Sequence, residues 1–316
     1  MVGALRSGDG AHDHLAWLFP GQGSQRTGMG LDLYEAFPAA QEVFRRADEA
    51  LGFPLSRLCF EGPEDELLKT INAQPAIFTT SLACMAAAVG LGGLPAPAFV
   101  AGHSLGEYTA LVAAGMLELE EGLWLVRERG RLMQEVGERN PGVMAAIMGL
   151  DETELEEVCR EAGAEVCNIN SPVQTVIGGR REAVVMAIDL ARARGAKRAI
   201  LLNVGSAFHS SLMRDVQVGM ARALAELDFR DAEVPVVANT SGQPIYKGEQ
   251  VRSELLEQLC RPVQWVRCVQ YMVGAGVAAF VEVGPGRVLT GLTRSIAPHV
   301  RTLSLDDAPS VWSLVR

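Results

Sequence analysis

Short apolar runs that stop at glycine or proline limit this 316-residue chain to few architectures. Residues 15–19 (LAWLF) are followed by Pro20 and Gly21, and residues 98–102 (AFVAG) end at Gly102, two positions before Ser104. Both runs have the length and apolarity of buried strands. Because helical patterns separate them, we expect a parallel sheet that helices cover on both faces. Such a sheet places functional loops at the carboxyl ends of its strands.

Helical patterns fill most of the remaining chain. They are expected at residues 31–51, 64–90, 105–115, 120–137 and 286–297, with further strands at 234–240 and 278–284. The segments between and after these two strands are also expected to be helical.

Residues 142–204 follow a different order. A strand-like run (GVMAAIMGL) precedes a helix that Asp151 caps and that has acidic residues in its first turn. Two strands around Ser171, a helix ending at Gly195 and a final strand complete the series. This β-α-β-β-α-β order is the split pattern of a ferredoxin-like unit, so we predict a small domain inserted into a large one.

The domain boundaries follow from these patterns. We predict a flexible N-terminal extension at residues 1–14, a large α/β domain at 15–138 and 206–316, and a ferredoxin-like small domain at 139–205. The extension lacks the apolar run of a signal peptide. The chain also has no uninterrupted apolar stretch of about eighteen residues, so we expect no membrane partner.

Charge and cysteine usage argue against several functions. The net charge of −10 disfavours binding to nucleic acid. The six cysteines form neither a C-x-x-C pair nor a zinc pattern, which predicts buried free thiols in a reducing cytoplasm. We expect a monomeric chain with no metal and no cofactor.

The segment GHSLGEY contains the pattern G-x-S-x-G in a meaningful context. A buried strand ends at Gly102 and a helix begins after Ser104, which is the arrangement of a nucleophile elbow. The glycines permit a sharp turn, and the new helix directs free backbone N–H groups at any anion formed there. An ordinary serine-capped helix is the alternative.

A serine needs a base to act as a nucleophile at neutral pH, and the chain has five histidines. Two lie in the N-terminal extension, and His299 has no turn chemistry beside it. His103 is expected to pack as a structural residue, because adjacent side chains diverge around such a turn. His209 follows the last strand of the small domain, where the chain returns to the large one. We predict His209 as the base, with a solvated loop histidine as the alternative.

The loop PGQGSQ follows the first strand. It is not a dinucleotide loop, because Arg26 stands where the third glycine should be, and it lacks the G-K-[ST] of a P-loop. We expect it to present the Gln22 amide to a developing oxyanion, with the backbone N–H of Leu105 as the second donor.

Three arginines lie in the helix after the elbow. Arg127, Arg129 and Arg131 cannot share a face, because residues two apart diverge by about 200° on a helix. An inward arginine would need an anionic partner, such as a substrate carboxylate. From spacing alone, a solvated surface position for Arg129 is favoured.

Several motifs follow one another in order: PGQGSQ, GHSLGEY, RGRLMQ, NINSP, AFHS, PVQW and EVGPG. Over about residues 15–297, this set resembles the malonyl-CoA:acyl carrier protein transacylases of fatty acid and polyketide synthesis. The resemblance implies an α/β-hydrolase-like core with a ferredoxin-like insert. It also implies transfer of a malonyl group from coenzyme A to an acyl carrier protein, whose phosphopantetheine supplies the accepting thiol.

The resemblance gives roles to the residues of the reacting centre. Ser104 would be the acylated nucleophile and His209 its base. Gln22 and the Leu105 amide would form the oxyanion hole. Gln264, in PVQW, would orient His209 through its backbone carbonyl.

The resemblance also assigns the acyl pocket. Arg129 would clamp the free carboxylate of the malonyl group, and Asn170 would help to shape the pocket. Phe208 would suit a small acyl group and crowd an α-methyl branch. Ser211 departs from the family, in which a proline commonly follows the His-Ser pair.

An acidic carrier protein would need a basic patch for docking. The candidates flank or end one helix of the small domain: Arg180, Arg181, Arg192, Arg194, Lys197 and Arg198. A solvated charged helix is the alternative for these residues. Alternatives for the whole chain are a hydrolase of acyl thioesters, a transferase for another acyl group, and a binding module without catalysis.

Overall fold

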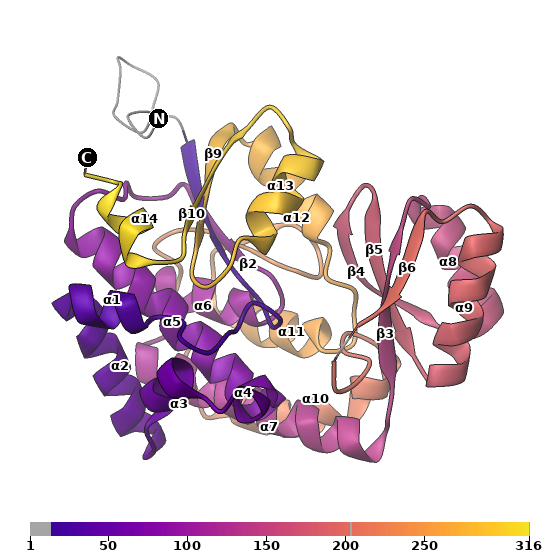
Figure 1. The fold of residues 1–316 in the computed structure, drawn as a ribbon, viewed down its shortest axis with the longest axis horizontal. Coiled ribbons are helices and arrows are strands. Elements are labelled where there is room, and N and C mark those ends of the chain that lie inside the picture. The colour runs from indigo at the N-terminus through magenta and orange to yellow at the C-terminus, as the bar shows by residue number, and fades with distance from the viewer. Residues whose placement is uncertain (1–13, 203, 316) are drawn as a thin grey trace.

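The computed structural model describes residues 14–202 and 204–315, so the predicted extension lies almost entirely outside the described residues. The larger sheet has the strand order β10-β9-β1-β2-β7-β8 (Figure 1). Its neighbouring strands are parallel except for the pair β7 and β8. The strands are β1 (His14–Phe19), β2 (Phe99–Gly102), β7 (Val236–Val237), β8 (Pro244–Ile245), β9 (Val277–Val283) and β10 (Arg301–Leu305).

Both faces of this sheet are buried, as the short apolar runs predict. Along β1, Trp17 and Phe19 pack into one hydrophobic cluster, whereas Ala16 and Leu18 pack into another. This alternation is the two-residue period of a strand covered on both sides. The first cluster includes residues of α5 (Thr70–Gly90), α6 (Leu105–Ala113) and α7 (Leu119–Arg139), and the second those of α12 (Trp265–Gly274) and α13 (Val288–Ile296).

A proline and an edge strand account for two of the differences from the predicted elements. The helix expected at residues 31–51 is divided at Phe37, because Pro38 lacks a backbone N–H and fits the first position of a new helix. Residues 301–305, expected to be helical, instead form the edge strand β10 beside β9. The other helices of this unit are α1 (Leu31–Ala36), α2 (Pro38–Leu51), α3 (Leu55–Glu61), α4 (Glu64–Leu68), α10 (Arg214–Ala225), α11 (Gly248–Gln258) and α14 (Ala308–Trp312), with the 3₁₀ turn η1 (Ser211–Met213) before α10.

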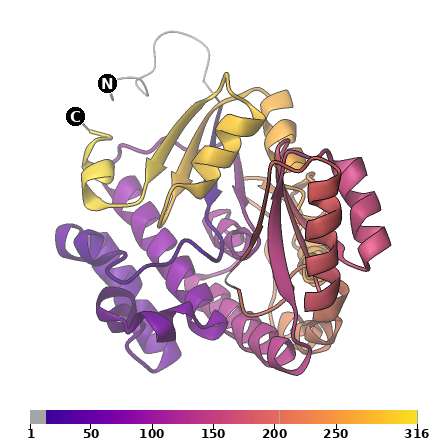
Figure 2. The same ribbon diagram turned by 45° about the vertical axis from the view of Figure 1, so that its right-hand side comes forward.

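The predicted β-α-β-β-α-β order is present in the middle of the chain. It consists of β3 (Val143–Met148), α8 (Glu152–Ala162), β4 (Glu165–Ser171), β5 (Gln174–Gly179), α9 (Arg181–Ala193) and β6 (Arg198–Leu201). The strands form an antiparallel sheet in the order β4-β5-β3-β6, and α8 and α9 pack on its outer face with a separate hydrophobic cluster (Figures 1 and 2). Asp151 caps α8 as predicted, accepting a hydrogen bond from the N–H of Glu154.

One helix of the described residues, α5, is long and apolar enough to span a membrane, with a mean hydropathy of 1.3. However, 78% of that window is buried inside the protein. A helix that is apolar all round is also typical of the core of a large domain. The packing of α5 against α2 and α7 therefore accounts for its apolarity.

Candidate active site

Ser104 occupies a strained turn between β2 and α6. Its φ and ψ angles are 52° and −105°, outside the usual regions for a residue with a Cβ. A Cβ on Gly102 would lie 1.9 Å from the carbonyl carbon of Gly106, and one on Gly106 would lie 2.0 Å from the carbonyl oxygen of Phe19. Both glycines of the motif are therefore required by close backbone packing, and the segment has the geometry of a nucleophile elbow.

An asparagine absent from the sequence predictions holds this turn. Asn239 Oδ1 accepts a hydrogen bond from the Ser104 N–H at 2.7 Å, and Asn239 Nδ2 donates to the carbonyl of Gly102 at 2.7 Å. The side chain is fully buried and follows β7, the neighbour of β2. Its place at the carboxyl end of a strand predicted over 234–240 is the signal that could have identified it.

The structure brings Ser104 and His209 together, although 105 positions separate them. His209 Nε2 lies 2.7 Å from the Ser104 hydroxyl oxygen. His209 follows β6 and precedes η1, with a φ of 59°. Its Nδ1 lies 2.6 Å from the backbone carbonyl oxygen of Gln258. Because a carbonyl only accepts, Nδ1 carries the ring proton, and Nε2 is left free to take the proton of the hydroxyl.

The predicted role of Gln264 toward His209 is wrong, because the carbonyl that orients the ring belongs to Gln258. Gln258 is the last residue of α11, and the final carbonyls of a helix have no intrahelical donor. That carbonyl is therefore free to accept from the imidazole. Gln264 instead precedes α12, and its backbone N–H donates to the carbonyl of Asn239 at 2.8 Å.

Arg129 is buried, with only 1% of its surface exposed, so the surface position favoured by spacing is wrong. Its Nη2 donates to the Ser104 hydroxyl oxygen at 3.1 Å and to Gln258 Oε1 at 2.9 Å. Its Nη1 donates to Gln74 Oε1 at 2.9 Å. The predicted divergence of the three arginines is present, since Arg131 instead pairs with Glu128 and Glu135 at the surface.

The two predicted oxyanion donors come from the loop after β1 and from the first turn of α6. Gln22 is in the half-buried loop after β1, where its Nε2 donates to Thr70 Oγ1 at 3.3 Å. This loop packs on the elbow, because a Cβ on Gly21 would lie 2.5 Å from the carbonyl oxygen of His103. Leu105 is the first residue of α6, so its N–H has no intrahelical acceptor. The role of both groups stays a prediction.

Asn170 and Phe208 lie next to other site residues. Asn170, in β4, accepts a hydrogen bond from His103 Nε2 at 2.8 Å. The His103 ring also packs against Trp265, with 5.5 Å between ring centroids, so His103 is a packed residue as predicted. Phe208 is buried in the main hydrophobic cluster, next to His209 in the chain. Their contribution to an acyl pocket stays a prediction.

The electrostatics of the site favour a neutral imidazole. Burial, followed by the nearby Arg129 charge, lowers the pKa of His209 from 6.5 to about 3. A base must be unprotonated to accept the serine proton. The His209 imidazole therefore stays neutral, and able to accept a proton, at pH values below the ordinary pKa of histidine.

We expect acylation of Ser104 by an acyl thioester to keep a constant kcat/KM from about pH 8 down to about pH 5.5. The lowered pKa of His209 keeps the free enzyme in its basic form throughout this range. The measurement is a pH profile of kcat/KM at fixed ionic strength, with circular dichroism as the control for folding. A decrease with a midpoint near the ordinary histidine pKa would contradict this assignment.

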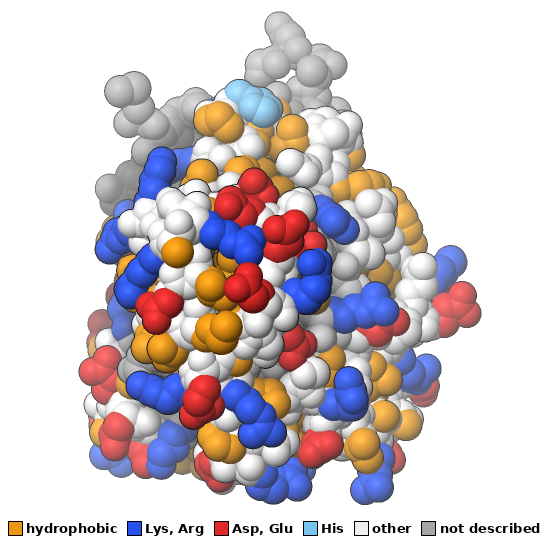
Figure 3. Space-filling model, turned by 90° about the vertical axis from the view of Figure 1, so that its right-hand side faces the viewer, with side chains coloured by type: hydrophobic (Ala, Val, Ile, Leu, Met, Phe, Trp, Pro, Cys, Tyr) orange, Lys and Arg blue, Asp and Glu red, His pale blue; other side chains and the backbone are white. Residues whose placement is uncertain are grey.

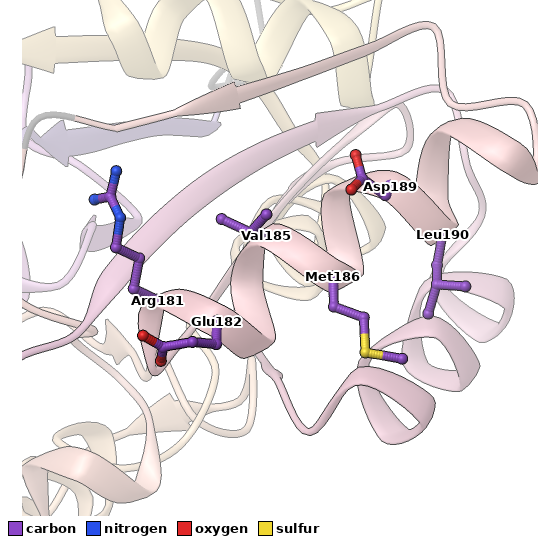
Figure 4. Close-up of a pocket in the computed structure, with 6 residues that line it drawn as sticks. All are labelled: Arg181, Glu182, Val185, Met186, Asp189 and Leu190. Carbon is purple, nitrogen blue, oxygen red and sulfur yellow. The ribbon is translucent and has the colours of Figure 1, made fainter.

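The surface of the small unit is mixed in charge. Figure 3 views the molecule from this side, and basic and acidic side chains alternate over it with apolar ones between them. A shallow hollow on the outer side of α9 is lined by Arg181, Glu182, Val185, Met186, Asp189 and Leu190 (Figure 4). Arg194, one of the docking candidates, pairs with Glu157 and Glu161. Carrier-protein docking on these basic residues stays a prediction.

Comparisons with known proteins agree with this geometry. Residues 16–301 match the acyl transferase domain family. The chain is 42% identical over 302 residues to the malonyl CoA-acyl carrier protein transacylase of Bacillus subtilis strain 168, covering 94% of this chain and 95% of that protein. For the Escherichia coli K12 protein of the same name, the identity is 43% over 297 residues, covering 93% and 96%.

A solved structure gives the same result. A malonyl-transacylase in complex with its type II polyketide synthase acyl carrier protein superimposes with a TM-score of 0.92 and 40% identity. The match covers 95% of this chain and 98% of that one. The chain belongs to the acyl transferase domain family and, within it, to the malonyl-CoA:acyl carrier protein transacylases.

Proposed function

We propose that this protein transfers a malonyl group from malonyl-CoA to the phosphopantetheine thiol of an acyl carrier protein, through a malonyl-Ser104 intermediate. The observation that carries the proposal is the buried Arg129 guanidinium, 3.1 Å from the Ser104 hydroxyl. A fixed positive charge beside a nucleophile suits an acyl group with a free carboxylate. The transacylase relatives support the same substrate.

The first half-reaction forms the acyl-enzyme. His209 Nε2 takes the Ser104 proton while the hydroxyl oxygen attacks the thioester carbonyl. The tetrahedral intermediate then expels the thiolate of coenzyme A, which receives that proton from His209. The hydrogen bond from Nδ1 to the Gln258 carbonyl keeps the ring in the required tautomer and orientation.

The negative charge of each tetrahedral intermediate falls beside the start of α6. The N–H of Leu105 and the side-chain amide of Gln22 are the proposed donors to it. Loss of one such donor costs about 3–4 kcal/mol of transition-state stabilisation. The positive end of the α6 dipole adds to the effect.

The second half-reaction repeats these steps with a new thiol. The phosphopantetheine thiol of the carrier protein gives its proton to His209 and attacks malonyl-Ser104. Collapse of the intermediate releases malonyl-carrier protein and returns the proton to the serine. The chain's own residues supply the nucleophile of the first half-reaction and the base and the oxyanion donors of both, whereas the carrier thiol is the nucleophile of the second.

We also propose which fold types the two units have and in which cell compartment the protein acts. The sheet order β6-β3-β5-β4 supports a ferredoxin-like small unit, and the elbow after β2 supports an α/β-hydrolase-like large one.

The cysteines, all within described residues, are unpaired, and all but the half-buried Cys260 are buried. This supports a cytoplasmic location. We also propose that the chain acts as a monomer.

Intact-mass spectrometry tests the proposal. The protein is mixed with malonyl-CoA or acetyl-CoA, the mass increase is followed, and holo-acyl carrier protein is then added. We expect malonyl loading to be the faster, followed by transfer of the adduct to the carrier thiol. Faster acetyl loading would contradict the malonyl assignment, and release of the acyl group to water in place of the thiol would favour the hydrolase alternative.

A further inference from the structure

Neutral groups hold the buried arginine of the site. Arg129 donates to the amide oxygens of Gln74 and Gln258, each at 2.9 Å, and its guanidinium lies 5.1 Å from the centre of the Tyr108 ring. Burial raises the pKa of Tyr108 to about 12, so its hydroxyl is uncharged at neutral pH. Within the described residues, no carboxylate forms an ion pair with Arg129. An arginine this deeply buried ordinarily has an acidic partner.

Further hydrogen bonds fix the orientation of both amides. Gln74 Nε2 lies 3.4 Å from the sulfur of Met133. Gln258 Nε2 donates to the backbone carbonyl of Ser104 at 3.0 Å and to Glu107 Oε2 at 2.5 Å. Each glutamine therefore turns its oxygen toward the guanidinium. Both side chains are fully buried, so water does not compete for these hydrogen bonds.

An acidic side chain lies nearby, but an amide separates it from the arginine. Gln258 accepts from Arg129 through Oε1 and donates to Glu107 through Nε2. Burial, followed by the neighbouring Glu254, raises the pKa of Glu107 well above its usual range, which favours its uncharged form. Among the described residues, the guanidinium of Arg129 therefore contacts amide oxygens and a hydroxyl and forms no direct ion pair with a carboxylate.

We infer that Gln74 and Gln258 determine acyl specificity: as amides they fix Arg129 in position without neutralising it, and so reserve its charge for the carboxylate of the acyl group. This inference rests on the proposed function, which places that carboxylate on Arg129. Glutamate has nearly the same size as glutamine, but at position 74 or 258 it would pair with the guanidinium. A malonyl carboxylate would then compete with an internal ion pair, whereas a neutral acetyl group would be unaffected.

The test compares Gln74→Glu with the uncharged control Gln74→Met in the full chain. Loading of Ser104 from malonyl-CoA and from acetyl-CoA is followed by intact mass over a range of concentrations. We expect Gln74→Glu to lower the malonyl-to-acetyl ratio of kcat/KM by about 10- to 100-fold, mainly by raising KM for malonyl-CoA. Gln74→Met removes one hydrogen bond and adds no charge, so its ratio should stay within about fivefold of the unchanged protein.

Two outcomes would overturn the inference. One is a Gln74→Glu ratio equal to that of Gln74→Met, and the other is loss of the malonyl preference in Gln74→Met as complete as in Arg129→Ala. Thermal unfolding shows whether each variant folds. If Gln74→Glu does not fold, Gln258→Glu decides by the same ratio, because it retains the backbone carbonyl that orients His209. Failure of the proposed function is a separate result, in which the unchanged protein itself loads acetyl as fast as malonyl.

Discussion

The Ser104→Ala variant is expected to form no acyl adduct and to transfer malonyl groups about 10⁶-fold more slowly than the unchanged protein. Alanine removes the oxygen that becomes acylated, while the oxyanion donors and Arg129 remain. The absence of a mass increase with malonyl-CoA tests the first part of this prediction. The rate at which malonyl-carrier protein appears tests the second.

His209→Ala is the informative companion variant. Serine and base act as a unit, so loss of either should reduce turnover by a similar factor. His209→Ala keeps the hydroxyl, however, and should still accumulate an adduct over long incubation. Acyl exchange at an undiminished rate in Ser104→Ala would show that the chemistry occurs elsewhere in the protein.

Arg129→Ala is expected to reverse the acyl preference. Malonyl loading should decrease by about 10²- to 10⁴-fold, because leaving one partner of a buried ion pair unmatched costs about 3–5 kcal/mol. Acetyl loading should stay unchanged or increase, since the acetyl group has no carboxylate to bind. Second-order loading rates for the two coenzyme A thioesters, measured by intact mass, provide the comparison.

Arg131→Ala is a matched control on the same helix. Arg131 pairs with Glu128 and Glu135 at the surface, and such exposed pairs contribute about 0–1 kcal/mol. Its loading rates should stay within about twofold of those of the unchanged protein. If Arg129→Ala retained the malonyl preference, the carboxylate clamp would have to be assigned to another residue.

The sequence was most informative where backbone geometry restricts residue choice. The glycines around Ser104 mark a turn that tolerates no Cβ, and the uninterrupted apolar run LAWLF marks a strand buried on both faces. The first pattern has a steric cause and the second follows from burial, so both can be identified from the sequence. His209 was found by elimination among a few histidines, and its contact with Ser104 agrees with that choice.

The sequence was least informative where one backbone carbonyl or one interior amide decides the chemistry. Any residue at the end of α11 could supply the carbonyl that His209 contacts, so the identity of Gln258 gives no sign of it. Gln74 lies within the apolar helix α5, where periodicity cannot distinguish a buried amide from a packing residue. Arg129 was ambiguous for a related reason: spacing shows that neighbouring arginines diverge, but not which one faces inward.

The backbone angles of Ser104 limit which nucleophiles this scaffold can use. At a φ of 52° and ψ of −105°, a second heavy atom on Cβ would crowd the flanking peptide groups. Threonine carries a hydroxyl of the same reactivity, yet its branched side chain is disfavoured in this conformation. The turn thus restricts evolutionary replacement of the nucleophile to unbranched side chains such as cysteine, and leaves a threonine-based enzyme inaccessible without remodelling the loop.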